Sequence, residues 1–415
     1  MRVAFFTTLF PKLSEPFVLD QIVGLIDRGH EVDIYAARSN GMSKLQPDVV
    51  RYELLRRTHY RTSPPKNYLR RLIHIPGLFV RKGRHNPGAF FRALNVRRYG
   101  RRAGSLELLY TCCDLMPRRE YDIVHAHFGP NGAYAADLRD LGVLTGGLVT
   151  TFHGYDATYH LRAFGPGVYG RLFESGEVFT VNTGFTGQNV VKLGCPPEKI
   201  IVLPVGLHLS RFAPRPRSVQ SNGEVIVLTV ARLVEKKGVE YAVQSMAKVG
   251  KRHPNARLLV VGDGPLRGQI EALIQSLAMG DNVELLGWKD HDELRELYAK
   301  TDVFMLPSVT ASNGDMEGQG LVLQEAQAMC IPVVSTLHNG IPEGVQDGVS
   351  GFLVPERDPD ALADRLIHLI EQPRLREEMG RAGRQFMEQK YDLEKLNDRL
   401  VEIYQNVIKF RGAGR

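Results

Sequence analysis

Short apolar runs rich in β-branched residues alternate along the chain with longer segments whose apolar residues recur at helical spacing. The first kind of segment indicates a buried strand, and the second an amphipathic helix. Regular alternation of the two predicts parallel sheets with crossover helices, once in each half of the chain. The expected strands lie at 3–8, 31–37, 122–128, 148–154, 178–183 and 200–206, and then at 225–233, 257–265, 283–288, 303–308 and 332–337.

The alternation is interrupted at residues 208–223, a polar stretch that contains Pro214 and Pro216 and lacks apolar periodicity. We interpret this stretch as a linker, since 415 residues are too many for one ordinary core. The sequence therefore predicts an α/β fold with two Rossmann-like, doubly wound parallel-sheet domains, 1–207 and 224–390, facing each other across a cleft. A C-terminal helix at 391–415 can pack back on the first domain. Ligands are expected at the carboxyl ends of the strands.

Composition is that of a soluble globular protein, with 43% hydrophobic and 24% charged residues. The apolar start ends at Pro11 and Lys12, which is too short for a signal-peptide core and is typical of a first buried strand. No apolar run approaches the roughly 18 residues of a membrane span. The four cysteines form no CxxC pair, so we expect reduced thiols and a cytoplasmic protein. A peripheral position on the inner face of the cell membrane is left open.

Positive charge is concentrated in residues 51–110, which contain 15 Lys or Arg and two acids, Glu53 and Glu107. The segment carries +13, whereas the whole chain carries +7. Three interpretations are open: a solvated basic face, a surface that attracts anionic lipid or a lipid-phosphate acceptor, and a nucleic-acid site. We favour the second, because each basic residue near an anionic membrane contributes about 1 kcal/mol. No nucleic-acid module signature accompanies the segment, so no nucleic-acid partner is expected.

Two cations, Arg232 and Lys237, follow the first expected strand of the second half, just before a helix that begins near Gly238. Such a pair beside a helix N-terminus suits a diphosphate, since Arg offers a planar fork and Lys a point charge. An ordinary surface turn is the alternative interpretation.

The next expected strand ends in Gly262-Asp263-Gly264-Pro265. Gly262 and Gly264 would allow a nucleotide to approach the backbone closely, and Pro265 is expected at the first position of a helix. This signal is weak alone, because many αβ units turn on such a sequence.

The stretch EGQGLVLQEAQAM at 317–329 contains two glutamates eight positions apart, Glu317 and Glu325. A helix beginning near Gly320 would direct its free N–H groups at a phosphate, and Gly318 and Gly320 would keep side chains out of the way. Glu325 could accept hydrogen bonds from ribose hydroxyls, and Glu317 from those of a sugar. Burying an acid among apolar residues is costly unless it is paired, and the hydroxyls of a ligand would offset that cost by donating hydrogen bonds. The alternative is an ordinary acid near a helix N-terminus.

In the first half, His153 ends the expected strand at 148–154 and His127 ends its neighbour at 122–128. An isolated histidine is more often a structural hydrogen-bonding group, so that interpretation stays open for both. Ser14 and Glu15 precede Pro16 in the first strand-to-helix loop, where a helix cap and a sugar contact are equally compatible with the sequence.

No metal site is expected. Two DxD triplets, Asp290-His291-Asp292 and Asp358-Pro359-Asp360, stand directly before amphipathic segments. Helix capping explains them more simply than metal binding does. The cations Arg232 and Lys237 would take the place of a metal.

Together these motifs resemble the GT-B retaining glycosyltransferases of family 4. The resemblance rests on the Glu-x7-Glu spacing, on Arg232 and Lys237, on the Gly-x-Gly turn and on His153-Gly154, and it covers nearly the whole chain. FPKLSEPFV, HAHFGPNG, FHGYD, LGCPPEKI and PSVTASNGDMEGQG are similar to bacterial exopolysaccharide glycosyltransferases of the colanic-acid type. Gln319 departs from the family, which often has an aromatic residue at this position near the donor sugar.

The resemblance implies a retaining hexosyltransferase that moves a hexose from a UDP- or GDP-linked sugar to a lipid-linked saccharide acceptor, in exopolysaccharide or cell-surface glycan biosynthesis. It implies neither a metal nor a cofactor. Arg232 and Lys237 would stabilise the departing diphosphate, Glu317 would hold the donor sugar, and His153 would lie by the reacting centre. The resemblance further implies that the second domain binds the donor and the first the acceptor. The donor-binding residues would be Gly262, Gly264, Gly318, Gly320, Leu321 and Glu325, and the acceptor-side residues Ser14, Glu15 and His127.

Two alternatives stay open. One is another GT-B enzyme, a sugar-nucleotide epimerase or a phosphorylase, and the other is a membrane- or glycan-binding scaffold without activity. The presence of Arg232, Lys237, Glu317 and Glu325 argues against the scaffold.

Overall fold

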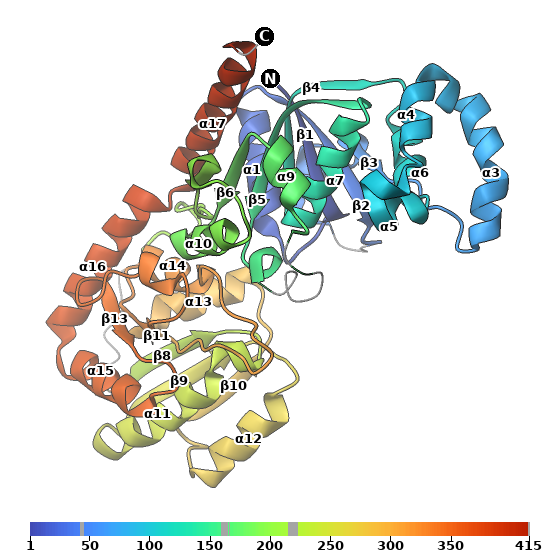
Figure 1. Ribbon diagram of the computed structural model, residues 1–415. Helices are drawn as coiled ribbons and strands as arrows, with labels where there is room; N and C mark the ends of the chain where they lie inside the picture. Colours follow the sequence, from blue (N-terminus) through green and yellow to red (C-terminus); the bar gives the residue numbers. More distant parts are fainter. Residues whose placement is uncertain (42–44, 159–164, 166, 215–222, 414–415) are drawn as a thin grey trace. The chain divides into compact units, whose positions relative to one another are not determined.

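The computed structural model describes residues 1–41, 45–158, 165, 167–214 and 223–413 (Figure 1). The chain forms two compact units. The first comprises Met1–Val181, Gly187–Leu203 and Asn397–Arg415, and the second comprises Asn182–Thr186 and Pro204–Leu396. Half of the predicted linker, residues 215–222, lies outside the described residues.

The first unit contains a sheet of seven parallel strands in the order β3-β2-β1-β4-β5-β6-β7. Its central strands are buried along most of their length, as expected for a parallel sheet with helices on both faces (Figure 1). The strands are β1 (Arg2–Phe10), β2 (Glu31–Ser39), β3 (Thr58–Tyr60), β4 (Arg119–His127), β5 (Leu144–Phe152), β6 (Val178–Val181) and β7 (Ile200–Val202). The helices of this half of the chain are α1 (Pro16–Asp27), α2 (Pro47–Arg51), α3 (Tyr68–Arg81), α4 (Pro87–Arg92), α5 (Val96–Gly104), α6 (Glu107–Asp114), α7 (Gly129–Asp140), α9 (Gly170–Ser175) and α10 (Gly184–Lys192).

The second unit contains a sheet of six parallel strands in the order β10-β9-β8-β11-β12-β13. The strands are β8 (Val225–Val230), β9 (Ala256–Val261), β10 (Val283–Gly287), β11 (Val303–Leu306), β12 (Val333–Thr336) and β13 (Gly351–Val354). The helices are α11 (Val239–Arg252), α12 (Arg267–Ser276), α13 (His291–Lys300), α14 (Leu321–Ala328), α15 (Pro359–Glu371) and α16 (Pro373–Lys390). The two parallel sheets with flanking helices confirm the predicted fold class.

Each sheet reverses its strand order at one point, and ligands of open α/β sheets bind at such points. In the first sheet the reversal lies between β1 and β4, and in the second between β8 and β11. His127 is the last residue of β4. Glu15, Lys237 and Glu317 lie in the connections that follow β1, β8 and β11.

The last helix, α17 (Leu393–Ala413), extends from the second unit into the first. Its Tyr404 hydroxyl lies 2.6 Å from Nδ1 of His125 on β4. A Cβ on Gly147 of β5 would lie 2.3 Å from Cγ1 of Val407. The helix therefore packs directly on the first sheet, at a glycine.

Both DxD triplets are helix caps, as predicted. Asp290 accepts hydrogen bonds from the N–H groups of Asp292 and Glu293, and Asp358 accepts from those of Asp360 and Ala361. The expected helix start at Pro16 is confirmed, with Glu15 as the N-cap residue of α1 and no side-chain capping hydrogen bond. The expectation for Pro265 is wrong, because helix α12 begins at Arg267 and Pro265 lies in the preceding turn.

The basic segment folds into β3, which pairs with β2 at the edge of the first sheet, and helices α3 to α6, of which α3 and α4 lie at the right of Figure 1. The rings of Phe79, Phe90 and Phe91 pack together with centroids 5.2 to 5.6 Å apart and attach α3 to α4. Over the described parts of the chain, no helix combines the length and the apolar composition needed to cross a membrane.

We predict that Gly380→Ala destabilises the second unit. A Cβ at Gly380 in α16 would lie 2.1 Å from the carbonyl oxygen of Cys330, and a backbone atom cannot give way as a side-chain end can. The loss in the free energy of unfolding should be about 1–3 kcal/mol. Denaturant unfolding followed by circular dichroism measures it.

Gly268→Ala in α12 is the matched control, because no atom lies within 4 Å of its added Cβ. Its stability should stay the same or rise by up to about 1 kcal/mol. Equal stability of the two variants would contradict the packing at Gly380.

Candidate functional site

The carboxyl edge of the second sheet collects most of the predicted site. Because its strands are all parallel, the loops that follow them meet at one edge. Arg232 and Lys237 follow β8, Gly262 and Gly264 follow β9, and Glu317 lies in the loop after β11. These residues therefore lie at or next to the point where the strand order reverses.

Lys237 and Glu317 form an ion pair at this point. Lys237 Nζ lies 2.5 Å from Glu317 Oε2, and the two side chains are only 14% and 15% exposed. Burial alone would raise the pKa of Glu317, but the Lys237 ammonium beside it, with Lys236, brings the pKa below its usual value. Glu317 is therefore a carboxylate at neutral pH, and two predicted site residues are joined directly.

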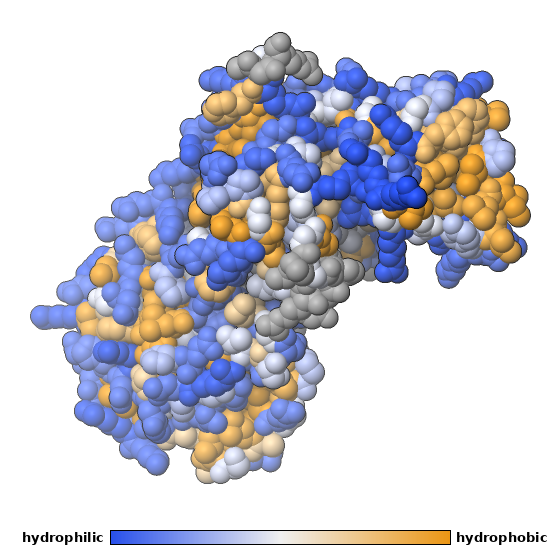
Figure 2. Space-filling model, viewed as in Figure 1, coloured by the Kyte–Doolittle hydropathy of each residue, from blue (hydrophilic) through white to orange (hydrophobic). Residues whose placement is uncertain are grey.

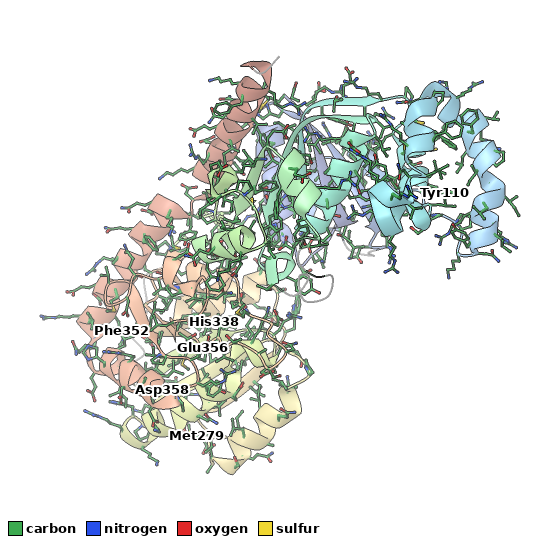
Figure 3. All side chains as sticks on the ribbon, viewed as in Figure 1. Tyr110, Met279, His338, Phe352, Glu356 and Asp358 are labelled. Carbon is green, nitrogen blue, oxygen red and sulfur yellow. The ribbon has the colours of Figure 1, made fainter. Side chains whose placement is uncertain are left out.

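His338 and Glu356, which the sequence analysis missed, hold the Glu317 loop in place. The backbone N–H of Glu317 donates to His338 Nε2 at 3.0 Å, and His338 Nδ1 lies 2.5 Å from Glu356 Oε1 (Figure 3). A ring nitrogen that accepts an N–H carries no proton, so His338 is protonated on Nδ1 and donates to Glu356. The rule about strand ends could have found His338, since it follows β12 by two residues.

Glu325 lies in the second turn of α14, half-buried, and its Oε2 accepts a hydrogen bond of 2.9 Å from the hydroxyl of the buried Tyr298. Burial raises the pKa of Glu325 to about 7, and the Tyr298 hydrogen bond offsets only part of that rise. Oε1 has no hydrogen bond with a described residue. Glu325 therefore offers one oxygen for a ligand while the other is held.

Arg232 is exposed and has no hydrogen bond or ion pair through its side chain to any described residue. The loop that carries it is fixed by the two glycines after β9. A Cβ on Gly262 would lie 2.0 Å from the Ala231 carbonyl oxygen, and one on Gly264 would lie 2.5 Å from that of Leu233. Gly262 and Gly264 are thus needed for contact between two loops, a role that the sequence analysis had not given them.

The start of α14 is built by Gly318, Gln319, Gly320 and Leu321. Gly320 has a φ of +71° and is the N-cap residue, and no side chain caps the helix. Buried Gln319 receives the N–H of Val205 at 2.9 Å and donates to its carbonyl at 2.8 Å. Gln319 therefore anchors the loop to residue 205, while the first N–H groups of α14 have no side-chain partner among the described residues.

In the first unit, His127 and His153 lie together at the ends of β4 and β5. His127 Nδ1 is 3.0 Å from His153 Nε2, and the His153 ring packs on Phe17 and Phe128 at centroid distances of 4.5 and 4.6 Å. Burial lowers the pKa of His153 to about 3 and that of His127 well below its usual value. Both imidazoles are therefore neutral at pH 7.

Asp156, also missed, holds the His153 loop. Its buried carboxylate accepts from the backbone N–H of His153 at 2.9 Å and from that of Gly129 at 2.8 Å. Burial raises the pKa of Asp156 to about 6, although these backbone hydrogen bonds lower it in part. The available sequence signal was the spacing of His153 and Asp156 in FHGYD. A carboxylate three positions after a residue can accept a hydrogen bond from the backbone N–H of that residue.

The first strand-to-helix loop contains Ser14 and Glu15, whose contact with an acceptor stays a prediction. Glu15 forms an ion pair with Lys12, and Ser14 is exposed. Phe17, two residues beyond Glu15, is the residue of this region that touches His153. Among the described residues, no group of three or more His, Cys, Asp or Glu side chains is arranged to hold a metal ion.

Comparison with known proteins covers both units. Residues 14–211 match the family described as Glycosyltransferase Family 4, and residues 211–386 match Glycosyl transferases group 1. The Salmonella typhimurium protein described as colanic acid biosynthesis glycosyltransferase WcaL is 36% identical, covering 98% of this chain and 100% of its own. Its Escherichia coli counterpart is 39% identical over 88% of this chain and 90% of its own. The amylovoran biosynthesis glycosyltransferase AmsK of Erwinia amylovora is 34% identical over 89% and 91%.

Among solved structures, that of Anabaena HepE in complex with UDP has a TM-score of 0.73, covering 98% of this chain and 100% of its own. The two sequences are only 17% identical, so the likeness bears on the fold.

We predict that Glu325 makes stability depend on pH. Because its folded-state pKa of about 7 lies above its usual value of 4.5, its contribution is full below about pH 4.5 and is lost as the pH rises through 7. Glu325→Gln should therefore be more stable than the wild type by about 1–3 kcal/mol at pH 8, and the difference should fall below about 1 kcal/mol at pH 5. Unfolding in urea at both pH values measures this difference.

Glu378→Gln, at an exposed position on α16, is the control and should shift stability little at either pH. A Glu325→Gln effect of the same size at pH 5 and pH 8 would contradict the raised pKa.

Proposed function

The chain belongs to the GT-B glycosyltransferases of family 4, and from this we propose that it transfers a hexose from a nucleotide-diphosphate sugar to a lipid-linked saccharide in exopolysaccharide biosynthesis. The family resemblance predicted from the motifs is confirmed. The observation that carries the proposal is the Lys237–Glu317 pair at the switch point of the second sheet.

The diphosphate of the donor binds against positive groups of the second unit. Arg232 is exposed and unpaired among the described residues, and the uncapped start of α14 offers backbone N–H donors. The Lys237 ammonium exchanges part of its contact with Glu317 for a phosphate oxygen. These donors oppose the charge that grows on the leaving diphosphate, which is the largest electrostatic demand of the reaction.

The hydroxyls of the donor bind to the two glutamates. Glu317 is ionised and accepts hydrogen bonds from the sugar, and Oε1 of Glu325 accepts them from the ribose. Tyr298 and Lys237 fix the orientation of these carboxyl groups before the ligand arrives. This order reduces the entropy that binding costs.

His153 takes part as a neutral hydrogen-bonding group. A histidine whose pKa is lowered to about 3 is too weak a base to remove the proton of an acceptor hydroxyl. In the proposed reaction the acceptor oxygen attacks the anomeric carbon as its bond to the diphosphate breaks, on the same face of the sugar. Attack on that face retains the configuration. The acceptor proton passes to an oxygen of the leaving phosphate, so the step needs neither a protein nucleophile nor a metal.

A lipid-linked acceptor fits the outer surface of α3. The apolar residues Leu69, Leu72, Ile73 and Val80 follow helical spacing and are 67%, 41%, 73% and 62% exposed. Figure 2 shows the resulting hydrophobic surface at the α3 end of the first unit. The same helix also carries basic residues, among them the exposed Arg70 and Arg81. An apolar stripe with basic neighbours is typical of a helix that lies on an anionic membrane.

We predict that Lys237→Met lowers kcat at least a hundredfold, because it removes a cation that opposes charge in the transition state. The assay screens UDP- and GDP-linked hexoses for transfer and for hydrolysis, and NMR of the product gives its anomeric configuration. Lys251→Met, at an exposed position on α11, is the control and should keep full activity.

Activity should also survive a chelator, since Arg232 and Lys237 take the place of a metal. Normal turnover by Lys237→Met would refute the site, and loss of activity in chelator that Mn²⁺ restores would refute the metal-free reaction.

We predict that Leu69→Ser, Ile73→Ser and Val80→Ser together weaken binding to phosphatidylglycerol vesicles at least tenfold. Each change removes a large apolar side chain that the membrane would bury, worth about 1.5–3 kcal/mol when burial is complete. Vesicle sedimentation measures the binding.

Val349→Ser changes an exposed apolar residue of the second unit and should leave vesicle binding intact. Equal binding by the triple variant and the wild type would exclude α3 as the membrane surface.

A further inference from the structure

A large cavity of about 1140 Å³ lies within the first unit, beside the switch point of its sheet. Thr8 and Leu9 from the end of β1 and Arg38 from the end of β2 line it, as does Asn131 near the start of α7. The side chain of Asn131 donates to the carbonyl oxygen of His127 at 2.7 Å. The cavity is therefore joined through a single residue to the histidine pair of the proposed acceptor side.

The walls of the cavity carry a large excess of positive charge. Seven arginines line it, against two acids, Glu107 and Asp137. Several of these arginines come from the basic segment, so that segment is more than a solvated face. Guanidinium groups that share one surface repel one another, so the binding of an anion among them is electrostatically favourable.

Four of the seven arginines are paired and held in place. Arg61 lies 3.3 Å from Glu107, Arg98 lies 2.6 Å from Asp140, and Arg102 and Arg171 lie 2.6 and 3.1 Å from Asp137. Arg61 also stacks over the Tyr134 ring, 3.9 Å from its centroid. These contacts build a rigid wall.

The remaining three differ. Arg71 donates to the backbone carbonyls of Pro65 and Ser105 at 2.6 and 2.7 Å. Arg38 and Arg101 line the cavity, are exposed, and have no side-chain hydrogen bond or ion pair with any residue that the structure describes. The guanidinium groups of these two unpaired arginines can each donate two hydrogen bonds to the oxygens of a phosphate or diphosphate.

Arg71 connects this cavity to the helix that is proposed to contact lipid. Arg71 lies on α3, the helix whose outer face carries the exposed apolar stripe. Figure 2 shows this hydrophobic surface beside a strongly hydrophilic region over α5, which contributes Arg98, Arg101 and Arg102. A molecule with an apolar chain and a phosphate head would meet both surfaces in turn.

We propose that this arginine-lined cavity binds the phosphate or diphosphate group of the acceptor, through Arg38 and Arg101. The proposal rests on the proposed glycosyl transfer, whose acceptor it describes more closely. The phosphate comes from a lipid carrier or from a soluble phosphorylated saccharide, and the ligand chemistry at the two arginines is the same in both cases.

The test compares Arg38→Gln/Arg101→Gln with the wild type, using inorganic pyrophosphate, farnesyl diphosphate and farnesol as probes in calorimetry. The double change breaks no side-chain hydrogen bond or ion pair within the described residues, so the fold should persist. Both diphosphates should bind the wild type, and the double variant should bind each at least tenfold more weakly. Arg97→Gln, also exposed on α5 but outside the cavity wall, should bind as the wild type does.

Farnesyl diphosphate binding at least tenfold more tightly than pyrophosphate would identify a lipid carrier, whereas equal affinities would identify a soluble phosphate. Unchanged affinity in the double variant, or equal binding of farnesol, would overturn the proposal. UDP and GDP binding, compared between the wild type and Lys237→Met, reports separately on the donor site. If the double variant binds both diphosphates as tightly as the wild type, and UDP and GDP still bind the wild type, the proposal for the cavity is rejected and the proposed donor site is not.

Discussion

The structure depends on one constraint: every strand in each sheet runs parallel to its neighbours, so every loop that can act chemically emerges at the same edge. In the second unit this places a lysine after β8 within 2.5 Å of a glutamate after β11, although 80 positions separate them in the sequence. Removing two opposite charges from water costs more than their attraction returns unless other groups complete their hydrogen bonds. The Lys237–Glu317 pair is therefore suited to a ligand that carries both hydroxyls and phosphate, since such a ligand can satisfy each partner.

Much of this edge could be predicted from the sequence, because strand ends follow from apolar runs. Lys237, Glu317 and His153 stand at such ends, and the structure places each at a switch point or beside it. For His338 and Asp156 the sequence offered only positional signals, two residues after a strand and three residues after His153, because the hydrogen bonds that define their roles depend on the tertiary fold. The same limit applies to Gln319. Its amide pairs with Val205, more than a hundred residues earlier in the chain, and nothing in the local sequence indicates that contact.

The glycines show a second limit of sequence reasoning. Gly262 and Gly264 were predicted to make room for a nucleotide. Many αβ units turn on the same sequence without binding a nucleotide, so the glycines alone could not decide. In the structure, their missing side chains make room for the carbonyl oxygens of Ala231 and Leu233. The two interpretations are compatible, because fixing the loop that carries Arg232 is itself part of building a diphosphate site. A sequence shows that a side chain must be absent, but the fold decides which atoms use the space.

The charge of the first unit illustrates how composition and structure complement each other. The sequence located an excess of arginine in residues 51–110 but could not separate a solvated face from a binding surface. The structure separates two uses: Arg98 and Arg102 of this segment pair with aspartates of α7, whereas Arg101 of the segment and Arg38 of β2, outside it, stay unpaired among the described residues. The ion pairs of Arg98 and Arg102 hold the cavity wall in place. A wall held in place keeps the charges of Arg38 and Arg101 at fixed positions. Stability and recognition in this unit therefore come from the same residue type, used in two ways within one cavity.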